Sequence, residues 1–254
     1  MHIRKNLYLA LFHILEVKNS FEQTSVSIVG MGGNGQLASM ILSAYDVNLT
    51  IIDGDTVEEN NIRRQPLFTR NDVGRKKSEV VFEKIMNRNS PTKVNYMDEY
   101  VDSANIGRIL KDSRFIFDAT DSFLTRELIN EYACKENIPW IMTNSYGDFG
   151  EVKLTVPGIT SCLNCLTNGK NMIPLNCHWE NVSPPVPSVI SGLGLKLFLD
   201  FKENGKLNGD MYFFDFSQYN ITRIGANRAR NCRVCVDGIY EKINDGKIIG
   251  RQLY

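Results

Sequence analysis

Short apolar runs alternate with segments of helical periodicity between residues 25 and 146. Strands are expected at 25–30, 48–53, 93–97, 114–120 and 139–144, and helices at 74–88, 104–110 and 124–137, with another around Leu37, Met40 and Ile41. The strands are continuously apolar rather than alternating, which is typical of strands buried on both faces. Strands that alternate with helices imply right-handed crossovers. The pattern therefore predicts an α/β fold with a mainly parallel sheet and flanking helices.

The pattern changes after residue 147. Residues 151–156 predict a strand outside the alternation, and residues 157–187, rich in Pro, Asn, Gly and Cys, predict a long mobile loop. A buried helix is expected at 189–201, entered through prolines that tolerate a first turn. C-terminal strands are expected at 210–216, within the core, and at 220–224. We expect residues 25–254 to form one domain with halves at 25–146 and 147–254.

The N-terminal segment, residues 1–24, predicts an amphipathic helix. Leu7, Leu11, Ile14 and Leu15 fit one helical face, while His13 and Glu16 interrupt the apolar run. No cleavage pattern of small residues follows, which argues against a signal peptide. No stretch reaches the roughly 18 apolar residues that a spanning helix needs. We therefore expect a cytoplasmic protein without a membrane segment.

Composition narrows the classes of partner. The 254 residues include 29 Lys and Arg against 29 Asp and Glu, so the formal net charge is zero. No global basic field attracts nucleic acid, and no long block of like charge marks a tail. We expect no nucleic-acid partner. A hydrophobic content of 43% is ordinary for a globular chain with a substantial core.

A glycine-rich loop, GMGGNG, lies between the first strand and its helix. Gly30, Gly32 and Gly35 satisfy G-x-G-x-x-G, and Gly33 adds a fourth glycine. Such glycines let the backbone approach a phosphate at a helix N-terminus. The second strand then ends in Asp53, where an acid usually holds ribose hydroxyls. Together these features predict nucleotide binding in a Rossmann-like half.

The segment ENNIRRQ follows this acid and changes the choice of nucleotide. Its polar residues supply amide donors and fixed cations, which suit a triphosphate better than the dinucleotide NAD. They are Asn60, Asn61, Arg63, Arg64 and Gln65. ATP is therefore the expected nucleotide.

The ordered motifs carry a family resemblance. They are G-x-G-G-x-G, D-x-D-x-V-x-x-x-N-x-x-R-Q, G-x-x-K, D-x-T-D and two C-x-x-C pairs, spread over residues 25–236. This order resembles the ubiquitin-activating-enzyme superfamily, and in particular the bacterial ThiF/MoeB/HesA adenylyltransferases. The resemblance implies that Asp53 binds ribose, that Asn61, Arg64 and Gln65 contact ATP phosphates, and that Lys77 is the phosphate-binding lysine. It also implies that Asp121 is the magnesium-associated aspartate.

The resemblance implies a reaction. Attack of a carboxylate on the α-phosphate of ATP forms an acyl-adenylate and releases pyrophosphate. Both reactants are anions, so Arg64, Lys77 and a Mg²⁺ near Asp121 are the expected catalytic groups that offset their repulsion. The expected substrate is a ubiquitin-like carrier protein ending in Gly-Gly or a ribosomal peptide. A homodimer is expected from the resemblance alone, and Arg4 is the one N-terminal arginine available to act across it.

Two C-x-x-C pairs predict a structural metal site. Cys162, Cys165, Cys232 and Cys235 can supply four thiolates to one tetrahedral Zn²⁺, which would join the long loop to the C-terminal segment. The resembling family carries zinc at these places. Cys134 is expected in the core. Cys177, next to His178, is either an acceptor of the activated acyl group or sulfur, or a loop cysteine without a covalent role.

Two other functions are compatible with the motifs. The chain could be an inactive nucleotide-binding partner subunit of an activating-enzyme heterodimer, although intact Arg64, Lys77 and Asp121 argue against this. A zinc-containing NAD oxidoreductase would also use the glycine loop and an acid after the second strand.

Overall fold

The computed structural model describes residues 24–88, 90–167 and 182–244. The expected N-terminal helix, Arg4, Cys177 and His178 lie outside these residues. Within the described part of the chain, no helix is both long enough and apolar enough to cross a membrane.

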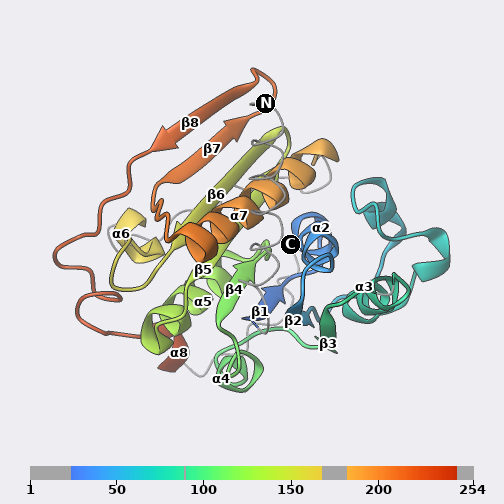
Figure 1. Cartoon of the computed structure of the whole chain (residues 1–254), viewed down its shortest axis with the longest axis horizontal. Coiled ribbons are helices and arrows are strands. Elements are labelled where there is room, and N and C mark those ends of the chain that lie inside the picture. Colours follow the sequence, from blue (N-terminus) through green and yellow to red (C-terminus); the bar gives the residue numbers. More distant parts are fainter. Residues whose placement is uncertain (1–23, 89, 168–181, 245–254) are drawn as a thin grey trace, which may run out of the picture.

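A single eight-stranded sheet runs through the described residues, in the order β3-β2-β1-β4-β5-β6-β7-β8 (Figure 1). The strands are β1 Thr24–Val29, β2 Val47–Ile52, β3 Lys93–Met97, β4 Phe115–Asp118, β5 Trp140–Tyr146, β6 Phe149–Thr155, β7 Met211–Asp215 and β8 Asn220–Ile224. The pairs from β3 to β5 are parallel, and those from β5 to β8 are antiparallel. The prediction of a mainly parallel sheet is confirmed. The antiparallel pairing begins at β6, the strand that was expected to depart from the strand–helix alternation.

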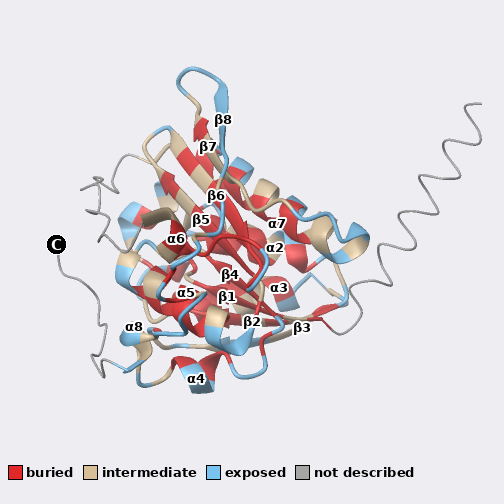
Figure 2. Ribbon diagram, turned by 90° about the vertical axis from the view of Figure 1, so that its left-hand side faces the viewer, coloured by how far each residue is buried: buried red, intermediate tan, exposed pale blue. Residues whose placement is uncertain are grey.

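Helices cover both faces of this sheet. They are α2 Gly33–Leu42, α3 Lys77–Met86, α4 Ile106–Ile109, α5 Phe123–Glu136, α6 Leu163–Thr167, α7 Pro185–Asn204 and α8 Glu241–Asn244, with 3-10 turns at Glu59–Arg63 and Arg70–Asp72. One buried cluster joins α2, α3 and α7 to strand residues such as Ile28 and Phe117. A second cluster joins α4, α5, α6 and α8 to the opposite face, through Ile116 and Trp140. Successive side chains of a strand point to opposite faces, so each central strand feeds both clusters. Figure 2 shows the buried centre of the sheet and the exposed outer strand β8.

Several element boundaries differ from the sequence prediction. The helix expected at 74–88 begins only at Lys77, because Gly74 has a φ of +86° and residue 76 pairs with Thr56 in a β-bridge. The expected loop 157–187 contains α6 and the first residues of α7 in its described parts. The prolines of the latter do occupy its first turn, where no intrahelical N–H is needed.

The expectation that β7 is a core strand is wrong for most of its residues. Only Phe214 is buried, while its neighbours are half-buried, because β7 is followed outward by β8 alone. Apolar content by itself does not distinguish a central strand from one near the edge.

The strand order creates a crevice beside β1. From β1 the chain first continues to β2 and β3 on one side of β1. It then crosses back to β4 on the other side, so the direction of strand order reverses at β1. In open α/β sheets, ligands bind outside the carboxyl ends of the strands at such a reversal. The glycine loop, Asp53 and Asp121 all follow strands that end at this edge.

Candidate active site

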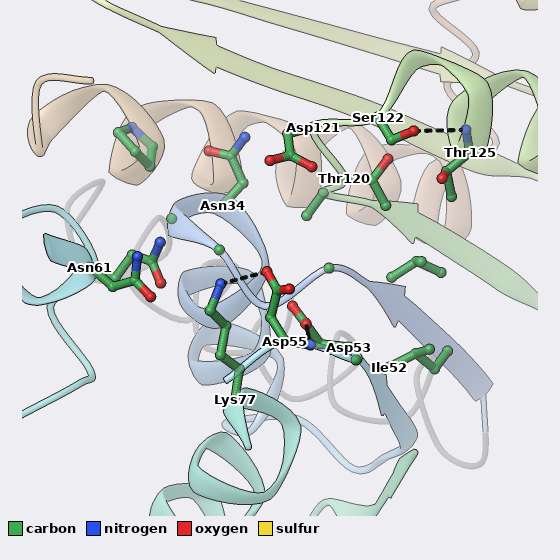
Figure 3. A pocket seen from close by; sticks show the side chains of 18 of the residues that line it. Asn34, Ile52, Asp53, Asp55, Asn61, Lys77, Thr120, Asp121, Ser122 and Thr125 are labelled. Atoms are coloured by element: carbon green, nitrogen blue, oxygen red, sulfur yellow. Dashed lines mark hydrogen bonds and ion pairs between the residues drawn. The ribbon is translucent and has the colours of Figure 1, made fainter. Parts of the chain in front are cut away.

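A cavity of about 310 Å³ opens at the carboxyl ends of β1, β2, β4 and β5. It contains nine of the ten residues that sequence reasoning assigned to nucleotide binding: Gly30, Gly32, Gly33, Asp53, Asn61, Arg64, Gln65, Lys77 and Asp121. The tenth, Gly35, is buried beneath the loop. In Figure 3, Lys77, Asp53 and Asp55 lie on one side of the cavity, and Asp121 lies across from them.

The glycine loop needs its glycines for different reasons. Gly30 has a φ of +91°, and a Cβ there would lie 2.7 Å from the carbonyl oxygen of Ala119. A Cβ at Gly35 would lie 1.8 Å from the carbonyl oxygen of Gly30, so the first turn of α2 packs directly on the loop. A Cβ at Gly32 would meet nothing within 4 Å, which leaves space over the loop. Among the described residues no side chain caps α2, and the start of this helix, with the positive end of its dipole, lines the cavity.

Asp53 is fixed by the backbone around it. Its Oδ2 accepts a hydrogen bond from the Met31 N–H at 2.5 Å, and its Oδ1 accepts one from the Asp55 N–H at 2.6 Å. A carboxylate oxygen can accept two hydrogen bonds, so each oxygen retains capacity for a ribose hydroxyl. Burial raises the pKa of Asp53, although the positive charge of Lys77 and the two backbone hydrogen bonds act against that rise.

The segment after β2 contains a 3-10 turn, Glu59–Arg63, and its polar side chains differ in whether they bond within the protein. Asn61 Oδ1 accepts from the Glu58 N–H at 3.0 Å, so this amide stabilises the turn itself as part of a capping box. Gln65 is buried, and its Oε1 has no hydrogen-bond partner among the described residues. An unpaired buried amide oxygen at a cavity wall points to a donor supplied from the cavity.

Gln36 joins this segment to the glycine loop. Its Oε1 accepts from the Leu67 N–H at 2.7 Å, and its Nε2 donates to the carbonyl oxygen of Gly32 at 3.2 Å. The fully buried Gln36 thus holds residues 64–67 beside the loop. Its local sequence carries no signal of this role, which depends on two segments meeting in space.

Asp121 is presented by a loop whose base is rigid. The buried Asp118 Oδ2 accepts from Arg126 Nε at 2.7 Å, and Arg126 also donates to the carbonyl oxygens of Thr120 and Thr143, at 2.6 and 2.9 Å. Asp118 Oδ1 accepts from the Thr120 N–H at 2.9 Å. A buried ion pair that also makes hydrogen bonds to the loop backbone favours one geometry of the loop. Sequence reasoning missed Arg126, although it lies one helical turn after the D-x-T-D motif.

The charge of the cavity is not the one expected. Five acidic side chains line it against two basic ones, Arg64 and Lys77. The acids are Asp53, Asp55, Glu58, Glu99 and Asp121. We expected a cationic site for two anionic reactants, and the described lining is instead acidic overall. An anionic nucleotide in such a cavity requires an additional cation, and carboxylate oxygens such as those of Asp121 suit Mg²⁺.

The four cysteines of the two pairs meet in space. Their sulfur atoms all lie within 4.8 Å of one another, with 3.8 Å between Cys162 and Cys165, 3.6 Å between Cys162 and Cys232, and 3.5 Å between Cys165 and Cys235. Tetrahedral zinc with Zn–S bonds of about 2.3 Å separates its sulfur ligands by about 3.8 Å. Separations of this size exclude disulfides within the cluster. The cluster therefore fits one Zn²⁺ with four thiolate ligands.

The protonation of these thiols also fits a cation. The neighbouring Cys162 thiol raises the pKa of Cys165 to about 12, and burial raises the pKa of Cys232 to about 11. Cysteine binds zinc as the thiolate, so a metal in this cluster would take the place of the thiol protons. Cys134, expected in the core, is half-buried and packs against this cluster.

Comparison with known proteins supports the family resemblance that was drawn from the ordered motifs. The ThiF family model matches residues 4–234. The chain is 29% identical over 228 residues to the SAMP-activating enzyme E1 of Haloferax volcanii, covering 87% of this chain and 83% of that protein. It is 30% identical over 171 residues to the sulfur carrier protein ThiS adenylyltransferase of Bacillus subtilis, covering 66% of this chain and 51% of that one.

The fold is similar to that of a solved structure with bound nucleotide. A crystal structure of E. coli MccB with ATP superposes with a TM-score of 0.76 at 25% sequence identity, over 86% of this chain and 68% of that one. The resemblance inferred from the motifs is confirmed, because the family model matches most of the chain. The chain belongs to the ThiF family.

Proposed function

We propose that this protein catalyses the ATP- and Mg²⁺-dependent adenylylation of a carboxylate and releases pyrophosphate. The observation that carries the proposal is the convergence of the glycine loop, Asp53, Arg64, Lys77 and Asp121 on one cavity at the reversal of strand order. The relatives support it, since several are named adenylyltransferases.

The residues divide the work between binding and charge stabilisation. Asp53 accepts from ribose hydroxyls, and the backbone N–H groups at the start of α2 donate to phosphate oxygens. Arg64 and Lys77 stabilise negative charge that develops on the phosphates during attack and departure. Asp121 holds Mg²⁺, which when bound supplies the positive charge that this acidic cavity lacks. The attacking carboxylate is already ionised, so no general base is needed, and positioning does most of the remaining work.

We propose a substrate whose carboxylate ends a flexible polypeptide tail, on a small ubiquitin-like carrier or a ribosomal peptide. The support comes from relatives: one is named a sulfur carrier protein adenylyltransferase, and structures of MccB were solved with the peptide MccA. We also propose a homodimer, on family resemblance alone. Sedimentation of the purified chain should give twice the monomer mass, and a monomer would contradict this part.

Pyrophosphate exchange into ATP, measured with candidate carriers and peptides, tests the reaction. Arg64→Ala and Asp121→Ala should each reduce exchange by about a hundredfold or more, as loss of a transition-state charge contact does. Arg63→Ala is the matched control, because the neighbouring guanidinium is exposed and does not line the cavity. Normal exchange in the first two variants would contradict the site.

The alternatives are separated by ligand and activity. ATP with Mg²⁺, and not NAD, should raise the melting temperature, since a true ligand stabilises the fold by mass action. Stabilisation by ATP without exchange on any candidate would favour the inactive partner subunit. Cys177→Ala should leave adenylation intact, and a changed later product would assign this cysteine the acceptor role.

A further inference from the structure

We propose that Tyr100 and Asp55 are positioning residues that aim Lys77 at the nucleotide phosphates, an inference that rests on the proposed ATP site. Neither residue was given a role by the motifs. Both line the cavity, together with Lys77.

The three side chains form one hydrogen-bonded chain. The Tyr100 hydroxyl donates to Asp55 Oδ1 at 2.6 Å, and Lys77 Nζ donates to Asp55 Oδ2 at 3.0 Å. Tyr100 thus binds one oxygen of the carboxylate, which turns the other oxygen toward the lysine. The side chain of Lys77 is only 9% exposed, and its ammonium has three donors. One donor is on Asp55, and among the described residues no other hydrogen bond of this ammonium is found, so two donors can reach phosphate oxygens.

The backbone fixes the position of Asp55 independently. Its carbonyl oxygen accepts from the Lys77 N–H at 3.0 Å, and Lys76 Nζ donates to the carbonyl oxygen of Gly54 at 3.1 Å. The first turn of α3 is therefore attached to the loop that carries Asp55. The hydrogen bond from the Tyr100 hydroxyl in addition restricts the rotation of the Asp55 carboxylate.

Gly54 leaves the space that the Tyr100 ring occupies. A Cβ at residue 54 would lie 2.7 Å from the ring. The aromatic ring thus packs directly on the backbone between the two aspartates of D-x-D, where a larger residue would displace it. This contact explains how Tyr100, which follows the neighbouring strand β3, reaches Asp55.

The hydrogen bonds that link Tyr100, Asp55 and Lys77 matter for nucleotide binding because a lysine side chain is flexible. A four-carbon side chain has many rotamers, and ordering it when a ligand binds costs conformational entropy. If one rotamer is already fixed before the nucleotide binds, the complex does not lose this entropy. Asp55 also offsets the charge of a nearly buried ammonium while the cavity contains no phosphate. The shared carboxylate therefore holds the Lys77 ammonium in one direction.

A double-mutant cycle tests this assignment by calorimetric titration with ATP and Mg²⁺. Tyr100→Phe keeps the ring over Gly54 and removes the hydroxyl, so ATP affinity should fall about tenfold, the scale of a hydrogen bond to a charged group. In a Lys77→Met background, Tyr100→Phe should change affinity less than about twofold, since its effect passes through the lysine. Equal losses in both backgrounds would overturn the proposal.

Two controls keep the result interpretable. Tyr96→Phe, which removes an exposed hydroxyl on β3 outside the cavity, should leave ATP affinity unchanged. Gly54→Ala, which displaces the ring, should reproduce or exceed the loss in Tyr100→Phe, and an unchanged affinity there would also overturn the proposal. If wild-type protein does not bind ATP, the proposed function fails. If it binds ATP and Tyr100→Phe binds equally well, only the positioning inference fails.

Discussion

The carboxylate of Asp53 has two roles, since it stabilises the backbone of the loop and also lines the cavity. Its oxygens hold the Met31 and Asp55 N–H groups, which shapes the loop, and the same oxygens face the cavity. Burial raises its pKa, so the folded chain keeps this proton to a higher pH than the unfolded chain does. As the pH rises from the ordinary value of 3.8 through the raised value, this group therefore lowers the free energy of unfolding.

Ligand binding should show the opposite pH dependence at Asp53. The ionised carboxylate is the better acceptor for ribose hydroxyls, so affinity for adenosine should decrease on acidification, with a midpoint above the ordinary aspartate value. Adenosine is the useful probe because it carries no titrating phosphate. Calorimetric titration over a pH series would measure the step. Asp53→Asn should weaken binding at every pH and remove the step; if the step persists there, another group causes it.

At the scale of elements, α7 depends on a glycine, Gly194, to approach the sheet. A Cβ at Gly194 would lie 3.1 Å from the ring of Phe117 and 3.2 Å from Ile141, whereas a Cβ at Gly192 would meet nothing within 4 Å. The helix packs on β5 and β6 and also contacts α2, where Ser191 Oγ donates to the carbonyl oxygen of Asn34 at 2.9 Å. The distance between α7 and the sheet therefore contributes to the position of the glycine loop.

This pair of glycines provides a matched comparison within one helix. Gly192→Ala should stabilise the protein by about 0.5–1 kcal/mol, the usual difference in helix propensity. Gly194→Ala gains the same propensity but crowds Phe117 and Ile141, so it should be less stable than Gly192→Ala by about 1–3 kcal/mol. Urea unfolding of both variants measures the difference. Equal stabilities would mean that the sheet contact is not tight.

The parallel strands were predictable from sequence because continuous apolar runs are buried on both faces wherever they lie in such a sheet. The start of α3 was not predictable to the residue. It depends on the bridge between Thr56 and Lys76, two residues that are distant in sequence. The short helix α6 was missed because residues 163–167 are too few to show a helical period.

Across the whole molecule, the cysteine cluster joins segments that the sheet leaves apart. Cys162 and Cys165 follow β6, and Cys232 and Cys235 follow β8. Lys153 of β6 is 1% exposed and donates to the carbonyl oxygen of Gly209 at 2.5 Å. Burial lowers the pKa of Lys153 to about 8, while the nearby Cys162 thiol acts in the opposite direction. A zinc ion with four thiolates is anionic overall, so Lys153 would offset part of its charge.

Metal removal should therefore destabilise the protein, and Lys153 should change the size of that effect. Chelation of zinc should lower the melting temperature of the wild type, because metal binding stabilises only the folded chain. Lys153→Met removes a buried ammonium. It should lower the melting temperature of the zinc-loaded protein, and it should leave unchanged or raise the melting temperature of the metal-free protein. Lys206→Met, at an exposed position, is the control. Zinc analysis with melting curves would decide, and an identical shift on chelation in all three proteins would contradict the charge offset.

The sequence alone determined the α/β class, the glycine loop and the two cysteine pairs, because each depends on local spacing or on residue chemistry. The candidate site residues were also identifiable, since the motifs keep their order along the chain. Only the tertiary structure decided which groups act on them. Arg126 beneath Asp121, Gln36 beside Leu67 and Tyr100 on Asp55 join segments that local sequence does not relate. The net acidity of the cavity likewise arises from side chains gathered from several strand ends. Through-space contacts and summed charge are properties of the folded chain.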